Sequence, residues 1–215
     1  MKSSQSITPS HDAARYAITG GIGSGKSYVC RLLEQRGIGV YDCDAAAKRL
    51  MRTSAVLRQQ LIGLIGSDAY LYDDSGNAVL NKAAVARFLL MSEANKQSIN
   101  DIVHPAVAAD FMSSGYQWLE SAILFESGFN RRIHFDAVIC VTAPYSVRLQ
   151  RIVHRDGISR EKAGEWIERQ WSQQEVLQRS DYEIINDGTQ PLLPQIDNII
   201  KQIEKHATDN SIHCR

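Results

Sequence analysis

The apolar positions near the start of the chain predict a strand that leads into a helix. Residues 15–21 form a short apolar run that ends in two glycines, as a strand entering a turn does. In the following segment Val29, Leu32 and Leu33 recur with helical spacing and share one face, and Gly37 ends the pattern.

A second strand is predicted over residues 38–44, and another helix opens at residues 45–51. The two strands and the helix between them have the length of a βαβ unit. Such a unit joins parallel strands, because a tight hairpin cannot connect strands that run in the same direction. The amino-terminal part therefore predicts an α/β protein with a parallel sheet flanked by helices.

The middle of the chain is mainly helical, and strands return after it. Between residues 48 and 115 apolar residues recur at helical intervals, except for a turn or short hairpin predicted at residues 72–80. Three later stretches predict strands, the second apolar enough to be buried on both faces: residues 122–125, 136–143 and 182–187. A helix over residues 192–206 follows the last strand.

These blocks predict one α/β core interrupted by two helical excursions, rather than two tandem domains. The length of 215 residues is enough to bury such a core. The expected parts are a disordered N-terminal leader at 1–14, a core at 15–47, 116–145 and 180–206, a helical insertion at 48–115, a charged helical segment at 146–179 and a C-terminal tail at 207–215.

The glycine-rich turn after the first strand predicts a phosphate-binding loop. Residues 20–27 fit the pattern G-x-x-x-x-G-K-S, and a predicted strand precedes them while a predicted helix follows. Glycines let several backbone N–H groups point at a phosphate, and the helix N-terminus adds partial positive charge. We expect Lys26 to reach the outer phosphates and the Ser27 hydroxyl to ligate Mg²⁺. The nucleotide-binding residues expected here are Gly20, Gly21, Gly23, Ser24, Gly25, Lys26, Ser27 and Tyr28.

The loop indicates a nucleotide donor site, and other features narrow the class of protein. A GTPase would carry the guanine-reading sequence Asn-Lys-x-Asp, but residues 81–84 and 95–98 begin with Asn-Lys and lack the aspartate. Motor and transporter ATPases are usually longer or carry adjacent acidic residues after a strand, whereas Glu126 stands alone after the strand expected at 122–125. A small-molecule kinase fits best.

Two aspartates mark the end of the second strand. Asp42 and Asp44 are two residues apart, which in an extended strand places both side chains on one face. We expect this strand to lie beside the first one, with its carboxyl end near the phosphate loop. A kinase needs a carboxylate there to accept the proton of the attacking hydroxyl or to hold Mg²⁺ through water. The alternative is that Asp44 serves as the N-cap of the next helix.

An arginine-rich face is predicted in the charged helical segment. Arg148, Arg151 and Arg155 are spaced by three and four residues and share one side of a helix. They belong either to a solvated, salt-bridged helix or to a lid that brings guanidinium groups to the transferred phosphoryl group. His104 precedes Pro105, and a proline favours an extended conformation of the residue before it. The pair therefore predicts that the helix breaks at His104.

Composition excludes several other classes. Lys+Arg and Asp+Glu both number 24, so a broad basic surface for duplex nucleic acid is not favoured. No apolar run approaches the roughly 20 residues that span a membrane, and residues 1–15 lack the apolar segment of a secretory signal. Four cysteines without CxxC spacing indicate reduced thiols rather than a zinc site: Cys30, Cys43, Cys140 and Cys214. We therefore expect a cytoplasmic protein without nucleic-acid or membrane partners.

Taken together, these motifs resemble the dephospho-CoA kinase family. The matching stretches occur in family order between Tyr16 and His206: TGGIGSGKS, VYDCDAAAKRL, IVHPAV, AILFESG, RIVHRDGISREKAGEWIERQ and SDYEIINDG. The resemblance implies a P-loop NTPase fold with a helical acceptor-binding domain at 48–115 and a lid at 146–179. It also implies that ATP, with Mg²⁺, phosphorylates the 3′-hydroxyl of dephospho-coenzyme A to give coenzyme A and ADP, the last step of coenzyme A biosynthesis.

The resemblance also implies residue roles. Asp44 corresponds to the catalytic base, with Asp42 supporting it or the metal, and Lys26, Arg151 and Arg155 complete the catalytic set. The remaining assignments are Asp42, Asp44 and His104 for the acceptor and Asn186 and Gly188 for adenine. The chain departs from the family pattern in five places: Tyr28 stands where Thr is usual, Ala-Ile-Leu at 122–124 where Pro-Leu-Leu is usual, Arg148 where Gln is usual, Val176 where Lys is expected, and Asn81 or Lys82 where Arg is usual.

Two alternatives remain open from the residues alone. One is a kinase for another small alcohol, such as a nucleoside, a nucleotide or a shikimate-like compound. The other is a nucleotide-gated binding module that binds ATP without transferring its phosphate. Asp44 disfavours the binding module, because a sensor needs no carboxylate on the acceptor side.

Overall fold

The computed structural model describes residues 14–213, with side chains described as far as residue 206. The leader expected at 1–14 falls outside these residues except for Ala14, and Cys214 also lies outside them.

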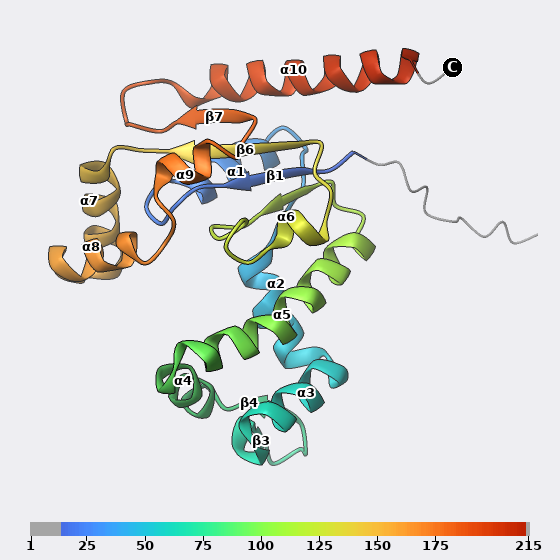
Figure 1. The fold of residues 1–215 in the computed structure, drawn as a ribbon, viewed down its shortest axis with the longest axis vertical. Coiled ribbons are helices and arrows are strands. Elements are labelled where there is room, and N and C mark those ends of the chain that lie inside the picture. The colour runs from blue at the N-terminus through green and yellow to red at the C-terminus, as the bar shows by residue number, and fades with distance from the viewer. Residues whose placement is uncertain (1–13, 214–215) are drawn as a thin grey trace, which may run out of the picture.

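A five-stranded, fully parallel sheet forms the centre of the molecule (Figure 1), which confirms the expected α/β class. The strands in spatial order are β2 (Val40–Asp42), β5 (Trp118–Glu120), β1 (Tyr16–Thr19), β6 (Ala137–Thr142) and β7 (Tyr182–Ile185). The expectation that the second strand lies beside the first was wrong, because β5 is inserted between them. Both Ile18 and Asp42 are in register with Glu120 as a result.

The prediction of a strand at residues 122–125 was also wrong. The strand, β5, ends at Glu120, and the apolar residues after it are buried in a series of turns. In these turns the N–H of Gly128 donates to the carbonyl of Phe125, and the N–H of Phe129 donates to that of Leu124. Leu124 and Phe125 are apolar because their side chains enter the core. A short apolar run in a buried turn has the same sequence pattern as a buried strand, so the pattern alone could not separate the two.

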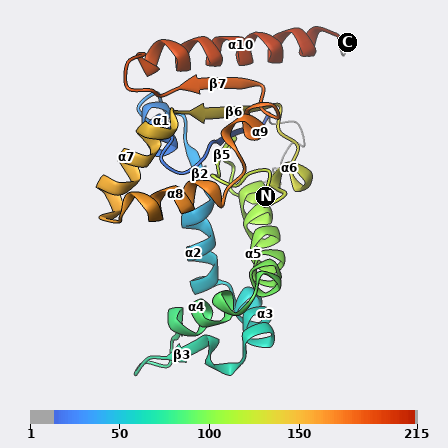
Figure 2. The same ribbon diagram turned by 60° about the vertical axis from the view of Figure 1, so that its left-hand side comes forward.

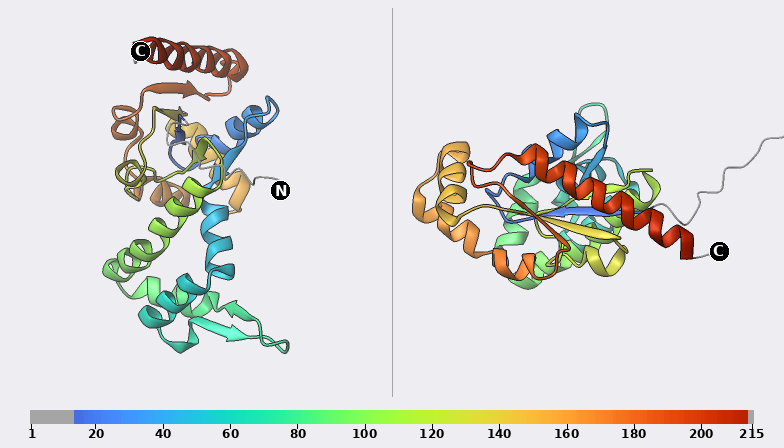
Figure 3. Two further views of the ribbon diagram at one scale, coloured as in Figure 1. Left: turned by 90° about the vertical axis from the view of Figure 1, so that its right-hand side faces the viewer. Right: turned by 90° about the horizontal axis from the view of Figure 1, so that it is seen from above.

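Helices α1 (Lys26–Glu34) and α10 (Leu192–His213) cover one face of the sheet, and Figure 3 shows α10 running across it. Alternate residues of β6 face opposite sides: Ile139 packs toward these helices, whereas Cys140 packs toward the other face. Both faces are therefore buried, as expected for a parallel sheet.

The other face of the sheet continues into a helical insertion that extends away from it (Figure 2). Its elements are α2 (Cys43–Thr53), α3 (Ala55–Ile65), the 3₁₀ turn Ser67–Ala69, the hairpin β3 (Tyr70–Tyr72) and β4 (Ala78–Leu80), α4 (Lys82–Met91) and α5 (Glu93–Ser113). The predicted hairpin is confirmed. The Asp73 carboxylate accepts the backbone N–H groups of Ser75 and Asn77 and so stabilises its turn.

The helix break predicted at Pro105 is absent, because α5 runs through this residue. Proline removes one backbone hydrogen bond from a helix interior and costs about 3 kcal/mol. Here Val103 and Val107, on either side of it, are both buried, while Pro105 itself is exposed. Packing of the apolar helix face outweighs the local preference, so His104 is helical rather than extended.

The charged segment folds as a short helical layer at the carboxyl ends of the strands. It contains α7 (Tyr145–Asp156), α8 (Arg160–Glu168) and α9 (Gln173–Leu177), while α6 (Phe129–Arg132) precedes β6. Leu149, Ile152, Ala163 and Ile167 form an apolar cluster of their own between α7 and α8. None of the described helices is long and apolar enough to cross a membrane.

Candidate active site

The predicted phosphate loop connects β1 to α1, as the motif requires. Its glycines are needed because neighbouring groups leave no room for side chains. Gly25, the N-cap of α1, has a φ of 96°, and a Cβ atom there would lie 2.0 Å from Asn186 Nδ2. Gly23 has a φ of 80°, and a Cβ there would lie 2.7 Å from the carbonyl oxygen of Arg148.

A hollow of about 630 Å³ opens beside this loop at the carboxyl ends of the strands. It is lined by nine of the predicted site residues: Gly23, Gly25, Lys26, Ser27, Tyr28, Asp42, Asp44, Arg151 and Arg155. Four further charged or polar side chains line it, to which the sequence assigned no role: Arg31, Glu120, His154 and Gln170. The remaining predicted residues do not line it: Gly20, Gly21, Ser24, His104, Asn186 and Gly188.

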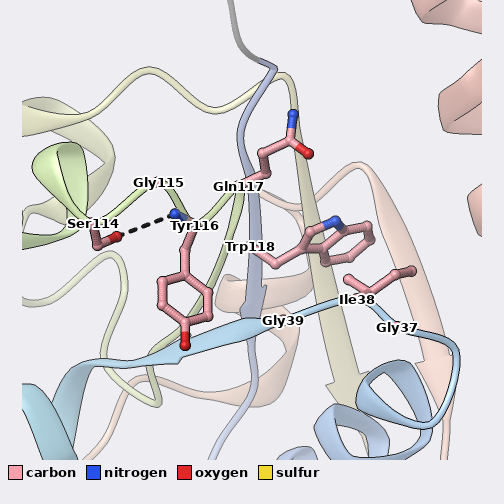
Figure 4. Close-up of a pocket in the computed structure, with 8 residues that line it drawn as sticks. All are labelled: Gly37, Ile38, Gly39, Ser114, Gly115, Tyr116, Gln117 and Trp118. Carbon is pink, nitrogen blue, oxygen red and sulfur yellow. Dashed lines mark hydrogen bonds between the residues drawn. The ribbon is translucent and has the colours of Figure 1, made fainter. Parts of the chain in front are cut away.

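A second hollow, of about 440 Å³, lies at the opposite end of the sheet (Figure 4). It is formed by Gly37–Gly39, which precede β2, and by Ser114–Trp118, which lead into β5. None of its eight lining residues carries a charge. The loop hollow is therefore the better candidate for phosphate chemistry, because cations and carboxylates converge there.

Asp42 and Asp44 both line the loop hollow, but not for the expected reason. The strand ends at Asp42, and Cys43 already begins α2, so the alternation of an extended strand does not apply. The N-cap of α2 is Asp42, whose carboxylate accepts the N–H of Ala45 at 2.9 Å. Asp44 lies in the first helical turn, exposed, and accepts no hydrogen bond from the described residues.

Glu120 lies between the phosphate loop and the two aspartates. Lys26 Nζ is 3.7 Å from Glu120 Oε1 and donates to the Gly20 carbonyl at 2.7 Å. Burial raises the pKa of Glu120, although Lys26 draws it down; burial lowers the pKa of Lys26, although Glu120 draws it up. The charged states of the two groups therefore depend on each other.

The arginine face is not a solvated surface at its first two positions. Arg148 is only 5% exposed, and its Nε donates to the carbonyl of Ile22 at 2.9 Å. Arg151 Nη1 donates to the carbonyl of Ser24 at 3.2 Å. Arg155, in contrast, is exposed and forms an ion pair with Asp156. Two of the three arginines thus hold the phosphate loop.

Gln170 completes this hold on the loop. Its Oε1 accepts the N–H of Ile22 at 2.7 Å, so both backbone polar groups of Ile22 bind side chains from the charged segment. Gln170 follows α8 in a segment without regular structure, and sequence periodicity therefore gave no signal for it.

Asn186 supports the loop from the other side. Its Nδ2 donates to the carbonyl of Ser24 at 2.8 Å, and its Oδ1 accepts from Arg151 at 3.2 Å. Gly188 follows it in an exposed turn with a φ of 91°. The adenine contacts expected from Asn186 and Gly188 stay a prediction.

His104 lies in α5, half-buried, with its ring centroid 5.6 Å from that of Phe129. Burial lowers the pKa of His104, and the charge of Arg132 adds to this. The imidazole is therefore neutral at neutral pH and packs against the segment that follows β5. Its expected role toward the acceptor stays a prediction.

The described cysteines are free and buried, in agreement with reduced thiols. Burial raises the pKa of Cys30 and of Cys140 to about 12, so both are protonated at neutral pH. Cys43 lies between the two aspartates, and its pKa is raised as well, by burial and by the charge of Glu120.

Comparison with known proteins gives a consistent family assignment. The family model described as dephospho-CoA kinase matches residues 15–191. A dephospho-CoA kinase of Bacteroides fragilis is 38% identical over 199 residues, covering 87% of this chain and 92% of that protein.

Solved structures agree in fold. The structure of TT1252 from Thermus thermophilus has a TM-score of 0.70 and 28% identity, covering 90% of this chain and 97% of the other. The dephospho-CoA kinase from Campylobacter jejuni has a TM-score of 0.59 and 19% identity, covering 91% and 98%.

The contact between Arg148 and the loop predicts a loss of nucleotide affinity when it is removed. Arg148→Leu deletes a hydrogen bond from a charged donor and leaves the Ile22 carbonyl unpaired, a cost of about 1.5–3 kcal/mol. We expect the dissociation constant of a non-hydrolysable Mg-ATP analogue to rise roughly 10- to 100-fold by calorimetry. Arg160→Leu, at an exposed position in the same segment, is the control. A folded Arg148→Leu variant with wild-type affinity would contradict the assignment.

Proposed function

This chain belongs to the dephospho-CoA kinase family, and we propose that its phosphoryl transfer takes place in the hollow beside the phosphate loop. The family resemblance inferred from the sequence is confirmed, and so is the kinase class. The reaction of this family moves the γ-phosphoryl group of ATP to the 3′-hydroxyl of dephospho-coenzyme A. The observation that carries the proposed location is the convergence of Lys26, three carboxylates and three arginines on one cavity.

The loop and the start of α1 would bind the phosphates of ATP. Backbone N–H groups at a helix N-terminus attract anions, and the cavity is walled by Gly23 and Gly25, which leave the backbone accessible. Lys26 now donates to the Gly20 carbonyl near Glu120, and we propose that it turns to the outer phosphates when nucleotide binds. Its positive charge would offset the charge of the transferred group.

The donor set suits Mg²⁺, which prefers hard oxygen ligands and is usually held by one or two carboxylates together with substrate phosphates. The Ser27 hydroxyl and the carboxylates of Asp42 and Glu120 line the same cavity and would hold the ion. When bound, it would neutralise charge on the phosphates.

Asp44 is the carboxylate best placed to act on the acceptor. One oxygen of Asp42 caps α2, and this carboxylate is proposed to hold Mg²⁺, whereas the Asp44 carboxylate is exposed and accepts no hydrogen bond from the described part of the chain. In the proposed step the 3′-oxygen forms a bond to the γ-phosphorus, the bond from that phosphorus to the bridging oxygen breaks, and ADP leaves. The hydroxyl proton passes to Asp44.

The two lid arginines would have different tasks. Arg151 donates to the Ser24 carbonyl and to Asn186, which suits a residue that holds the loop in shape. Among the residues that the structure describes, Arg155 forms an ion pair with Asp156 alone, and it can leave this exposed partner at little cost. We propose that Arg155 approaches the transferred phosphoryl group when the lid closes.

The wider organisation of the chain also belongs to this proposal. The acceptor-binding role of residues 48–115 is supported by α2, whose N-terminal end, with Asp42 and Asp44, lies at the hollow and which leads into this insertion. Figure 2 shows the insertion extending away from the sheet. The lid role of residues 146–179 is supported by the separate apolar cluster of α7 and α8. A cytoplasmic location and the absence of nucleic-acid partners stay predictions.

The function is tested by measuring ADP release with Mg-ATP in the presence and absence of dephospho-coenzyme A. We expect an acceptor-dependent rate and a product heavier by one phosphoryl group, with ³¹P NMR placing that group on the 3′-oxygen. Nucleosides, nucleotides and shikimate serve as competing acceptors. A higher kcat/KM for any of them would assign the enzyme to another alcohol.

Coupling between Lys26 and Glu120 predicts a change in pH dependence. The charge of Glu120 raises the pKa of Lys26, so Glu120→Gln should let Lys26 lose its proton at lower pH. The alkaline limb of kcat/KM for ATP should therefore move to lower pH, since this parameter reports groups of the free enzyme. Glu34→Gln, at an exposed position of α1, should leave the limb in place. An unmoved limb in Glu120→Gln would show that the two charges are not coupled.

A further inference from the structure

A third hollow lies between the segment that follows β5 and the segment that leads into and past α9. It has a volume of about 320 Å³ and is lined by Phe125, Glu126, Asn130, Arg131, Trp171 and Arg179. We propose that this hollow binds the adenosine diphosphate part of the acceptor. This inference rests on the proposed function, because it assigns the subsite that would carry the acceptor's ribose to Asp44.

The hollow shares two of its walls with the candidate active site. Ala122 lines the active-site hollow and Phe125 lines this one, three residues further along the same turns. Gln170 lines the active-site hollow and its neighbour Trp171 lines this one, and consecutive Cα atoms are about 3.8 Å apart. The two hollows therefore adjoin along the same two segments. In the proposal the adenine and the diphosphate lie in the third hollow, and the ribose between them faces Asp44.

Its position favours the acceptor over ATP. The segment with Phe125 and Glu126 follows β5, which pairs with β2, the strand that leads into α2 and Asp44. Asn186 follows β7 at the opposite edge of the sheet. The His104 ring of the helical insertion packs against Phe129 in the same segment, which connects the hollow to the proposed acceptor-binding domain.

One wall of the hollow is flat and aromatic. The rings of Phe125 and Trp171 are parallel to within 9°, with centroids 6.3 Å apart, as in offset stacking. Trp171 is 38% exposed, which is high for a tryptophan. Such a wall suits a planar base, because stacking of bases on aromatic side chains contributes about 1–3 kcal/mol per base.

A carboxylate supplies an acceptor for the edge of the base. Glu126 Oε1 accepts the backbone N–H of Trp171 at 3.2 Å, which fixes the side chain at the wall. Glu126 Oε2 is buried and has no hydrogen-bond partner among the described residues. A buried acceptor without a partner is costly, and the exocyclic amino group of adenine would satisfy it by donating one hydrogen bond.

Two arginines supply positive charge for the diphosphate. Arg131 forms no ion pair and no side-chain hydrogen bond within residues 14–206. The exposed Arg179 guanidinium lies over the Trp171 ring, 4.8 Å from its centre, and donates one N–H to the Glu175 carbonyl. In the proposal it leaves the ring face when the base stacks there and turns to the diphosphate. Guanidinium groups bind phosphates through paired N–H donors.

The stacking wall is tested by kinetics with both substrates. Trp171→Leu should raise KM for dephospho-coenzyme A about 5- to 100-fold and leave KM for ATP within twofold. Trp171→Phe, which keeps an aromatic face, should stay within a few-fold of wild type. A rise confined to ATP would place the donor's adenine here and overturn the proposal. If wild-type enzyme does not phosphorylate dephospho-coenzyme A at all, the proposed function fails instead.

The carboxylate is tested with an acceptor whose adenine has been deaminated to hypoxanthine, which replaces the amino donor by a carbonyl acceptor. Wild-type enzyme should prefer the adenine acceptor at least tenfold in kcat/KM, and Glu126→Gln should reduce this preference to about threefold or less. A merely structural Glu126 would lower both rates and leave their ratio unchanged, which would contradict the proposal.

Arg131→Gln provides a test that does not depend on the core, because this side chain is exposed. We expect KM for dephospho-coenzyme A to rise roughly tenfold, as for a lost charged hydrogen bond, with KM for ATP unchanged. Arg160→Gln is the matched control at another exposed position. Wild-type KM in folded Arg131→Gln and Trp171→Leu variants would rule out the subsite.

Discussion

The tight enclosure of the phosphate loop is the constraint on which the rest of the site depends. Helix α7 and Asn186 lie so close to Gly23 and Gly25 that a side chain at either position would overlap with them. This contact needs glycine backbone on one side and the closely packed α7 and Asn186 on the other. The loop amides are therefore arranged before nucleotide arrives, which lowers the ordering cost of binding.

The same enclosure gives the charged segment at residues 146–179 a second role. Arg148 and Gln170 bind the two backbone polar groups of Ile22, although they lie more than 20 residues apart in sequence. Trp171, next to Gln170, lies against the segment that follows β5, and its backbone N–H donates to the Glu126 carboxylate. Contacts on the donor side and on the proposed acceptor side are thus made by neighbouring residues of one short segment.

Much of this arrangement could be predicted from the sequence, because it depends on local patterns. The phosphate loop, the helix face of α1 and the hairpin follow from motif, periodicity and turn residues. Glu120 was missed because its importance comes from strand order: only the insertion of β5 between β1 and β2 places it beside Lys26. Gln170 lies in a stretch that matched the family, but its contact could not be predicted for a similar reason, since its partner Ile22 is distant in sequence. The break predicted at Pro105 was wrong because burial of the α5 face outweighed a local preference.

The central claim is that Asp44 acts on the acceptor hydroxyl while other groups bind ATP. The most direct test is the Asp44→Asn variant, with turnover and the dissociation constant of a non-hydrolysable Mg-ATP analogue measured on the same preparation. The account predicts that turnover falls by roughly 10²–10⁴-fold, the usual contribution of a general base, while the dissociation constant stays within a few-fold of wild type. Near-normal turnover would reduce Asp44 to a residue of the first turn of α2, and a proportional loss of ATP binding would move it to the donor site.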